Sequence, residues 1–123
     1  MTATKGYSYL YGNSEGKPSD RINFAYAHRF NPKTLMKHYY RHGEEVGASS
    51  AADYEGMAIT FANDVDNVQH DSYVDEHGST HKFSYETGEF IIVSNDGTII
   101  TYFIPTSGNA YWENERRRNH IES

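Results

Sequence analysis

The sequence predicts an α+β domain in which N-terminal helices pack on a four-stranded antiparallel β-sheet. Apolar residues recur at helical spacing between residues 31 and 65, and after about residue 70 their spacing changes to two, as in strands. A length of 123 residues suits one such domain. We expect residues 1–20, which are rich in Gly, Ser, Tyr and Asn, to be a loose leader, and residues 21–123 to form the domain.

Two helices are expected in the first half of the chain. The first begins at Asn31, which can cap it with Pro32 in the first helical position, and ends at Gly43. The second begins after Ser50, with Asp53 three residues further on, as in a capping box. The apolar residues of this second helix fall on one continuous face: Tyr54, Met57, Ala58, Phe61, Ala62 and Val65.

Four strands are expected in the second half, at residues 72–76, 80–85, 90–94 and 98–104. The third is apolar on both faces, which is typical of a central strand. The segment 95–97, Asn-Asp-Gly, predicts a hairpin because Asp-Gly suits a type I′ turn. Pro105 ends the last strand because proline cannot donate to a strand ladder. After it, Tyr111 and Trp112 predict a short terminal element that packs back on the sheet.

Composition and charge exclude several classes of protein. No apolar run approaches the roughly 18 residues of a membrane span, so we expect no membrane partner. The absence of cysteine excludes disulfides, cysteine–zinc sites and thiol catalysis. The net charge is −6, but residues 21–42 hold five basic residues and no acid, whereas residues 43–96 hold twelve acids and only Lys82. A basic patch for phosphate is therefore compatible with an acidic chain.

His38 and His42 are the first candidates for chemistry, because residues four apart share one helix face. Lys37 and Arg41 form a second such pair beside them. One interpretation of this pair is that both histidines are solvated residues on the surface of a helix, without a chemical role. A metal site would need a third ligand, and Tyr39 stands where the metalloprotease motif has Glu, so we expect no metal and no cofactor. General acid–base catalysis is the functional interpretation, because histidine transfers protons near neutral pH.

Lys82 and Thr101 are polar residues among the apolar residues of the predicted strands. Thr favours strands and Lys often points outward, so a structural role is one interpretation of both. Tyr111 can pack, stack on a nucleobase or donate a hydrogen bond. The run 116–118, Arg-Arg-Arg, is a solvated chain end or a phosphate contact.

Several short motifs together resemble a known family. Residues 38–47, H-Y-Y-R-H-G-E-E-V-G, are similar to an H-F-x-K-H-G-x-E-F-G element, and residues 50–54 to S-A-x-E-Y. Further similar segments follow in order at residues 82–83, 87–90, 96–99, 101–105 and 111–113. Across residues 33–113 the chain resembles the small C-terminal toxin domains of bacterial polymorphic toxins of the CdiA and Rhs types. The subset that it resembles is assigned to the barnase–EndoU–colicin–RelE group of ribonucleases.

This resemblance implies a metal-independent endoribonuclease that often cleaves tRNA and is neutralised by a cognate immunity protein. It also implies secretion or translocation as the C-terminal part of a larger protein, and action in the cytoplasm of a target bacterium. The catalytic positions implied by matching are His38, His42, Lys82, Thr101 and Tyr111. The two histidines would transfer protons, Lys82 would hold the scissile phosphate, and Lys37 and Arg41 would bind substrate.

The departures from the family pattern keep the residue type and remove no candidate catalytic group: Tyr39, Arg41, Val46 and Asp53. The residues do not decide which histidine is the base and which is the acid. Two other functions are compatible with the sequence. One is a non-catalytic binding module of a phage or secretion-system protein, and the other is a metal-dependent DNase that uses the seven histidines.

Overall fold

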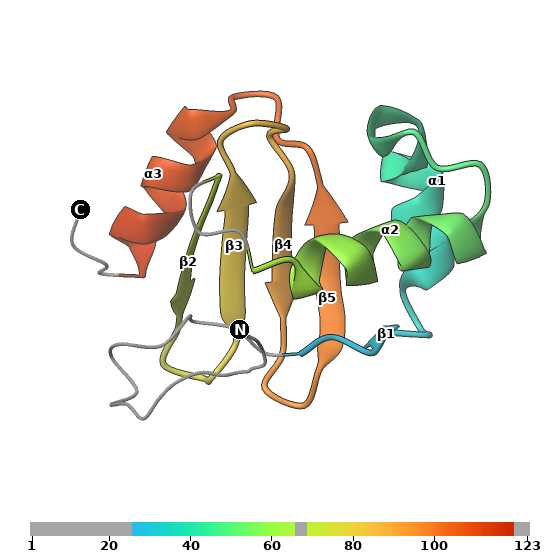
Figure 1. Cartoon of the computed structure of the whole chain (residues 1–123), viewed down its shortest axis with the longest axis horizontal. Helices are drawn as coiled ribbons and strands as arrows, with labels where there is room; N and C mark the ends of the chain where they lie inside the picture. Colours follow the sequence, from blue (N-terminus) through green and yellow to red (C-terminus); the bar gives the residue numbers. More distant parts are fainter. Residues whose placement is uncertain (1–25, 66–68, 120–123) are drawn as a thin grey trace.

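The computed structural model describes residues 26–65 and 69–119, and over these residues the chain forms five strands and three helices (Figure 1). The predicted α+β class is confirmed. The predicted leader, residues 1–20, lies outside the described residues. The elements are, in order, β1 (Arg29–Phe30), α1 (Leu35–Val46), α2 (Ala51–Asn63), β2 (His70–Val74), β3 (Thr80–Ser84), β4 (Phe90–Val93), β5 (Thr98–Phe103) and α3 (Asn109–Arg118).

The sheet has the strand order β1-β5-β4-β3-β2. The four predicted strands are present as antiparallel neighbours, and β4 is central, as predicted. The prediction of four strands is nevertheless incomplete, because β1 runs parallel to β5 as a fifth strand, with Arg29 opposite Thr98 and Phe30 opposite Ile99. Two residues are too few to display an alternating pattern. Instead, the Phe30 N–H donates to the Glu55 carboxylate of α2 at 2.8 Å, so tertiary contacts hold β1 in place.

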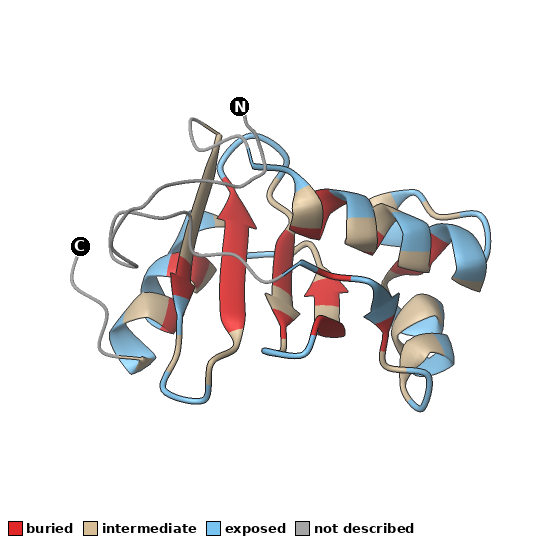
Figure 2. Cartoon of the chain, turned by 60° about the horizontal axis from the view of Figure 1, so that its bottom comes forward, coloured by how far each residue is buried: buried red, intermediate tan, exposed pale blue. Residues whose placement is uncertain are grey.

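The helices cover both faces of the sheet. α2 packs on one face, here called the α2 face, and shares a core cluster with the strand residues Ile91, Val93, Ile99 and Tyr102. α3 packs on the opposite face, here called the α3 face. There Trp112 is fully buried among Tyr73, Phe83 and Phe90. Figure 2 shows buried residues concentrated along the strands and on the helix sides turned toward them.

The terminal segment therefore packs back on the sheet, as Tyr111 and Trp112 predict. The expectation that the helices are N-terminal is wrong for α3, which follows the last strand. Its sequence, NAYWENERRR, is too polar to show a helical apolar stripe. The burial of Trp112 decides how this helix packs.

α1 lies at the edge of the sheet beside β5 and α2 (Figure 1). Its Leu35, Tyr39 and Val46 pack against the core of the α2 face. The helix begins one turn later than predicted, after Thr34. The Thr34 N–H donates to the Asn31 carbonyl at 3.1 Å in the preceding turn.

Gly43 does not end α1, contrary to the prediction. It is buried within the helix, where a Cβ would lie 2.6 Å from the ring of Tyr39, so glycine allows the close packing of this ring. The helix ends instead at Gly47, whose φ of 85° is left-handed. The Ala48 N–H donates to the Gly43 carbonyl at 2.8 Å, as in a Schellman motif.

α2 begins as predicted. The Asp53 N–H donates to the Ser50 hydroxyl oxygen at 3.0 Å, and the Ser49 N–H donates to the Asp53 carboxylate at 2.9 Å. Its predicted apolar face is the one that packs on the sheet, although Val65 lies beyond the helix end and is exposed. None of the helices in the described part of the chain is long and apolar enough to cross a membrane.

The hairpin between β4 and β5 forms at the predicted place. The Ser94 N–H donates to the Thr98 carbonyl at 2.8 Å, which encloses a loop of three residues and not the two of a type I′ turn. Gly97 closes this loop with a φ of 88°. In addition, a Cβ on Gly97 would lie 2.5 Å from the ring of His28, so both conformation and space require glycine here.

Candidate active site

Thr101 and Phe103 lie on the α3 face of β5. Side chains alternate along a strand, and Tyr102 between them is buried in the core of the α2 face. Phe103 packs against the cluster around Trp112 on the α3 face. Both Thr101 and Phe103 are only partly buried. This end of the α3 face is thus partly accessible, next to α1.

α1 brings both predicted histidines to this region. The ring of His42 stacks on Phe103, with centroids 5.0 Å apart and an interplanar angle of 27°. The ring of His38 lies 6.2 Å from that of His42 and 5.2 Å from Phe30 of β1. Both histidines are partly buried. The two rings therefore share one helix face, as their spacing predicts.

Each histidine contacts the protein through its Nδ1 atom. His38 Nδ1 lies 3.0 Å from the main-chain carbonyl oxygen of Thr34, which can only accept, so this nitrogen donates. His42 Nδ1 lies 3.2 Å from the Glu45 carboxylate and donates to it in the same way. Neither Nε2 atom makes a hydrogen bond to residues 26–65 or 69–119. Both Nε2 atoms thus keep an unused hydrogen-bonding position on partly buried rings.

Tyr111 of α3 lies on the same face. Its ring meets Phe103 edge-on at 5.6 Å and Phe90 at 5.1 Å. Burial and the neighbouring Glu115 carboxylate raise the pKa of Tyr111, so its hydroxyl keeps its proton at neutral pH. The structure thus gathers one set of residues from α1, β5 and α3, here called the His–aromatic surface: His38, His42, Thr101, Phe103 and Tyr111.

Lys37 and Arg41 are exposed on α1, beside the two histidines. Over the described ranges of the chain, neither side chain makes a hydrogen bond or an ion pair. Two unpaired cations next to two open imidazole nitrogens are suited to an anionic ligand.

Lys82 does not lie with the histidines. It pairs across the sheet with Ile91, a core residue of the α2 face, whereas Thr101, Phe103 and Tyr111 of the His–aromatic surface lie on the α3 face. The side chain is buried and reaches the C-terminal end of α2. There Nζ donates to the carbonyl of Phe61 at 2.7 Å and to that of Asp64, and it lies 4.9 Å from the Phe61 ring.

This position explains why a lysine is buried here. The last carbonyls of a helix lack intrahelical partners and form the negative end of its dipole, and a cation satisfies both. The implied role of Lys82 in holding the scissile phosphate has no support from this geometry, because Nζ is bonded to main-chain carbonyls at the end of α2.

Two residues of the site, Glu45 and Phe103, are not among those that the sequence predicts. Glu45 accepts from His42, and the same oxygen, Oε2, accepts the Ile104 N–H at 2.9 Å. Phe103 supports the His42 ring. The signals were present, because Glu45 follows His42 by three residues on one helix and Phe103 follows Thr101 by two on one strand.

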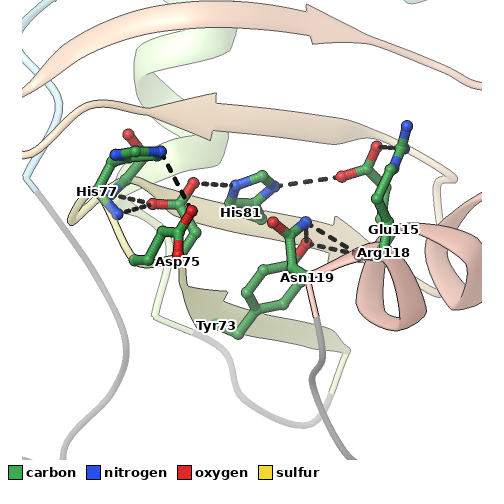
Figure 3. Close-up of polar contacts among 9 residues, drawn as sticks. Tyr73, Asp75, His77, His81, Glu115, Arg118 and Asn119 are labelled. Carbon is green, nitrogen blue, oxygen red and sulfur yellow. Dashed lines mark hydrogen bonds and ion pairs between the residues drawn. The ribbon is translucent and has the colours of Figure 1, made fainter.

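A second polar cluster holds α3 on the sheet (Figure 3). His81 of β3 is buried and lies between two carboxylates, with Nε2 2.8 Å from Asp75 and Nδ1 3.5 Å from Glu115. Its ring stacks on Tyr73 at 4.6 Å and 14°. The Tyr73 hydroxyl in turn donates to the main-chain carbonyl of Glu115 at 3.2 Å. The cluster therefore links the β2–β3 hairpin to the helix that carries Tyr111.

The Asp75 carboxylate accepts hydrogen bonds from the His81 ring and from the main-chain N–H groups of His77 and Ser79. Burial alone raises the pKa of its carboxyl group, but hydrogen bonds from His81 and from the main-chain N–H groups of Ser79 and His77 outweigh burial and hold the pKa below its ordinary value of 3.8. The ionised form is therefore the one that stabilises the fold. This contribution is complete above about pH 4 and is lost as the pH falls through the lowered pKa of the folded state.

We expect Asp75→Asn to lower the free energy of unfolding by about 1–3 kcal/mol at pH 7, because three donors lose a charged acceptor. The deficit relative to the unsubstituted chain should shrink as the pH is lowered from 7 toward 2. Urea denaturation at a series of pH values measures both effects. Glu76→Gln is the matched control, since Glu76 is the next residue and its side chain is 87% exposed. A deficit that stays constant with pH would contradict this assignment.

The described residues, 26–65 with 69–119, contain no group of three or more His, Cys, Asp or Glu side chains that could hold a metal ion. Comparison of the chain with models of known protein families gave no match, and comparison with curated proteins gave none either. The resemblance to polymorphic-toxin domains thus depends on the sequence motifs alone.

Proposed function

We propose that this chain is a metal-independent toxin ribonuclease that cleaves RNA, with tRNA as the expected substrate, by attack of a 2′-hydroxyl. The observation that supports it best is the pair of histidines on the His–aromatic surface. Both rings are anchored through Nδ1, and both leave Nε2 open. Their centroids are 6.2 Å apart, and a proton-transferring group acts at about 3 Å from its target. Each ring can therefore reach one of two oxygens bonded to the same phosphorus.

The reaction requires two proton transfers. One histidine accepts the proton of the 2′-hydroxyl as the 2′-oxygen attacks the adjacent phosphorus. The bond from phosphorus to the 5′-oxygen breaks, and the other histidine donates a proton to this leaving oxygen. The products are a 2′,3′-cyclic phosphate and a free 5′-hydroxyl, and no water is consumed.

The remaining residues of the site would bind the substrate. Arg41 and Lys37 are exposed cations that can offset the charge that develops on the phosphate. Phe103 and Tyr111 offer partly accessible aromatic rings, on which nucleobases stack in single-stranded RNA. Thr101 offers a hydroxyl on the same strand face as Phe103.

The motif resemblance also supports a proposal for how the chain is delivered, where it acts and how it is neutralised. The chain would be delivered as the C-terminal part of a larger secreted or translocated protein and would act in the cytoplasm of a target bacterium. A cognate immunity protein would neutralise it. Exposed carboxylates between residues 43 and 96, among them Glu44, Asp53 and Glu76, offer contacts for a basic patch on such a protein.

The test is incubation of the purified chain with total bacterial tRNA and with plasmid DNA, each with and without EDTA. We expect cleavage of tRNA in the presence of EDTA, with 2′,3′-cyclic phosphate ends. A substrate that carries a 2′-deoxy nucleotide at the mapped cleavage site should resist cleavage. Cleavage of DNA that requires a divalent metal would favour a DNase, and a folded chain that cuts neither would favour a binding module.

A further inference from the structure

Glu45 has two partners that come from different parts of the chain. Its Oε2 atom lies 3.2 Å from His42 Nδ1 and 2.9 Å from the main-chain nitrogen of Ile104, just after β5. A main-chain N–H can only donate and a carboxylate can only accept, so the Ile104 contact holds Glu45 whether or not His42 is present. A His–Glu pair on the solvent-exposed side of a helix would lack this second contact, the hydrogen bond from a main-chain N–H of another element.

His42 is consequently held on two sides. Its Nδ1 atom must carry a proton in order to donate to the Glu45 carboxylate. In a neutral ring this leaves the lone pair on Nε2. Phe103 stacks on the ring face and restricts its rotation. These contacts fix both the tautomer of His42 and the direction in which Nε2 points.

We propose that Glu45 is the positioning residue of His42: it holds Nδ1 in the protonated form and so presents Nε2 to the RNA. This inference rests on the proposed ribonuclease function. Glu45 does not touch the substrate. It acts through His42, in either direction of proton transfer at Nε2, because the Nδ1 hydrogen bond persists when Nε2 gains or loses a proton.

His38 provides an internal reference within the same site. Its Nδ1 atom donates to the neutral main-chain carbonyl of Thr34 at 3.0 Å, and no carboxylate takes part. A change at Glu45 should therefore alter His42 and leave His38 as it is.

The direct experiment is nitrogen-15 NMR of the histidine rings, compared between the unsubstituted chain, Glu45→Ala and Glu45→Gln. In the unsubstituted chain above the titration range we expect His42 to be mainly the Nδ1–H tautomer. In Glu45→Ala the Nε2–H tautomer should become the major form, with the pattern of His38 unchanged. Glu45→Gln should keep the Nδ1–H pattern, since the amide oxygen can accept the same hydrogen bond. Glu44→Ala is the matched control, because Glu44 is the exposed neighbouring carboxylate.

The kinetic experiment uses the same variants in RNA cleavage. We expect Glu45→Ala to lower kcat by about 10–100-fold, the range for residues that orient a functional ligand, with little change in KM. Glu45→Gln should recover most of kcat but shift its pH profile. Loss of general packing would not produce this separation between kcat and KM.

The outcomes separate this inference from the proposed function. An unchanged His42 tautomer in Glu45→Ala, or equal losses in Glu44→Ala and Glu45→Ala, would overturn the role of Glu45 even if RNA is cleaved. If Glu45→Ala changes the His42 tautomer but the unsubstituted chain cleaves no RNA, the proposed ribonuclease function is wrong. The inference that Glu45 sets the tautomer of His42 would still hold. If Glu45→Ala does not fold, the pH profile of kcat for Glu45→Gln is the deciding measurement. A profile identical to that of the unsubstituted chain would contradict the positioning role of Glu45.

Discussion

Replacement of His42 with alanine is expected to lower kcat for RNA cleavage by about 10²–10⁴-fold, the usual contribution of a positioned acid or base. The same range is expected for His38→Ala. The physical reason is that each ring is anchored through Nδ1 and offers Nε2 to the substrate, so its removal leaves one proton transfer without a partner. Single-turnover cleavage of a mapped tRNA substrate measures the loss. Near-UV circular dichroism verifies that each variant is folded.

The matched control is His77→Ala. The side chain of His77 is 80% exposed, and Glu76 is its only ion-pair partner among residues 26–65 and 69–119; it lies in the turn between β2 and β3, outside the His–aromatic surface. It should cleave RNA at the unsubstituted rate. The double variant, His38→Ala with His42→Ala, should lose little more than either single variant, because the two rings serve one reaction. Full activity of folded His42→Ala would refute the acid–base assignment.

Replacement of Lys82 with methionine is expected to lower the free energy of unfolding by about 2 kcal/mol. Methionine keeps an unbranched apolar side chain, one atom shorter than that of lysine, and removes the donor. The carbonyls of Phe61 and Asp64 then lose their partner at the end of α2, and this loss opposes the gain from no longer burying an ammonium group. Urea denaturation measures the change.

The rate of RNA cleavage distinguishes a structural role of Lys82 at the end of α2 from a role in binding the scissile phosphate. Because Lys82 lies on the α2 face, Lys82→Met should retain RNA cleavage when the rate is divided by the folded fraction. Lys33→Met is the matched control, since Lys33 is exposed and should change the free energy of unfolding by less than about 0.5 kcal/mol. A fully stable Lys82→Met variant that has lost cleavage would restore the phosphate-binding role implied by the family resemblance.

The parts of the fold that were predictable have strong local signals. The second helix combines a capping box at Ser50 and Asp53 with a long apolar face, and its start is confirmed by the hydrogen bond between these two residues. The four longer strands follow from alternation and from turns rich in glycine. Each of these signals depends on neighbours in the sequence, and local interactions alone are enough to produce it.

The parts that were missed depend on contacts between distant residues. β1 has two residues and exists because β5 and Glu55 supply partners for its main chain. The sequence predicts that α1 ends at Gly43, but this glycine is required by the space beside the Tyr39 ring and not by a helix end. No pattern in the sequence distinguishes a glycine needed for packing from a glycine needed for a left-handed φ.

The sequence by itself determined the α+β class, the hairpins and the pairing of His38 with His42, because helical and strand periodicities place these residues relative to their neighbours. Only the tertiary structure decided which side of the sheet each candidate occupies. Lys82 and Phe83 are consecutive residues of a strand, so their side chains point to opposite faces of the sheet. Nothing local decides that α2 covers Lys82 and that α3 covers Phe83. The tertiary structure also brings the main-chain N–H of Ile104, 59 residues away in the sequence, to the Glu45 carboxylate that contacts His42. Which face of the sheet a residue occupies, and which distant residue it contacts, depend on how the helices pack on the two faces of the sheet.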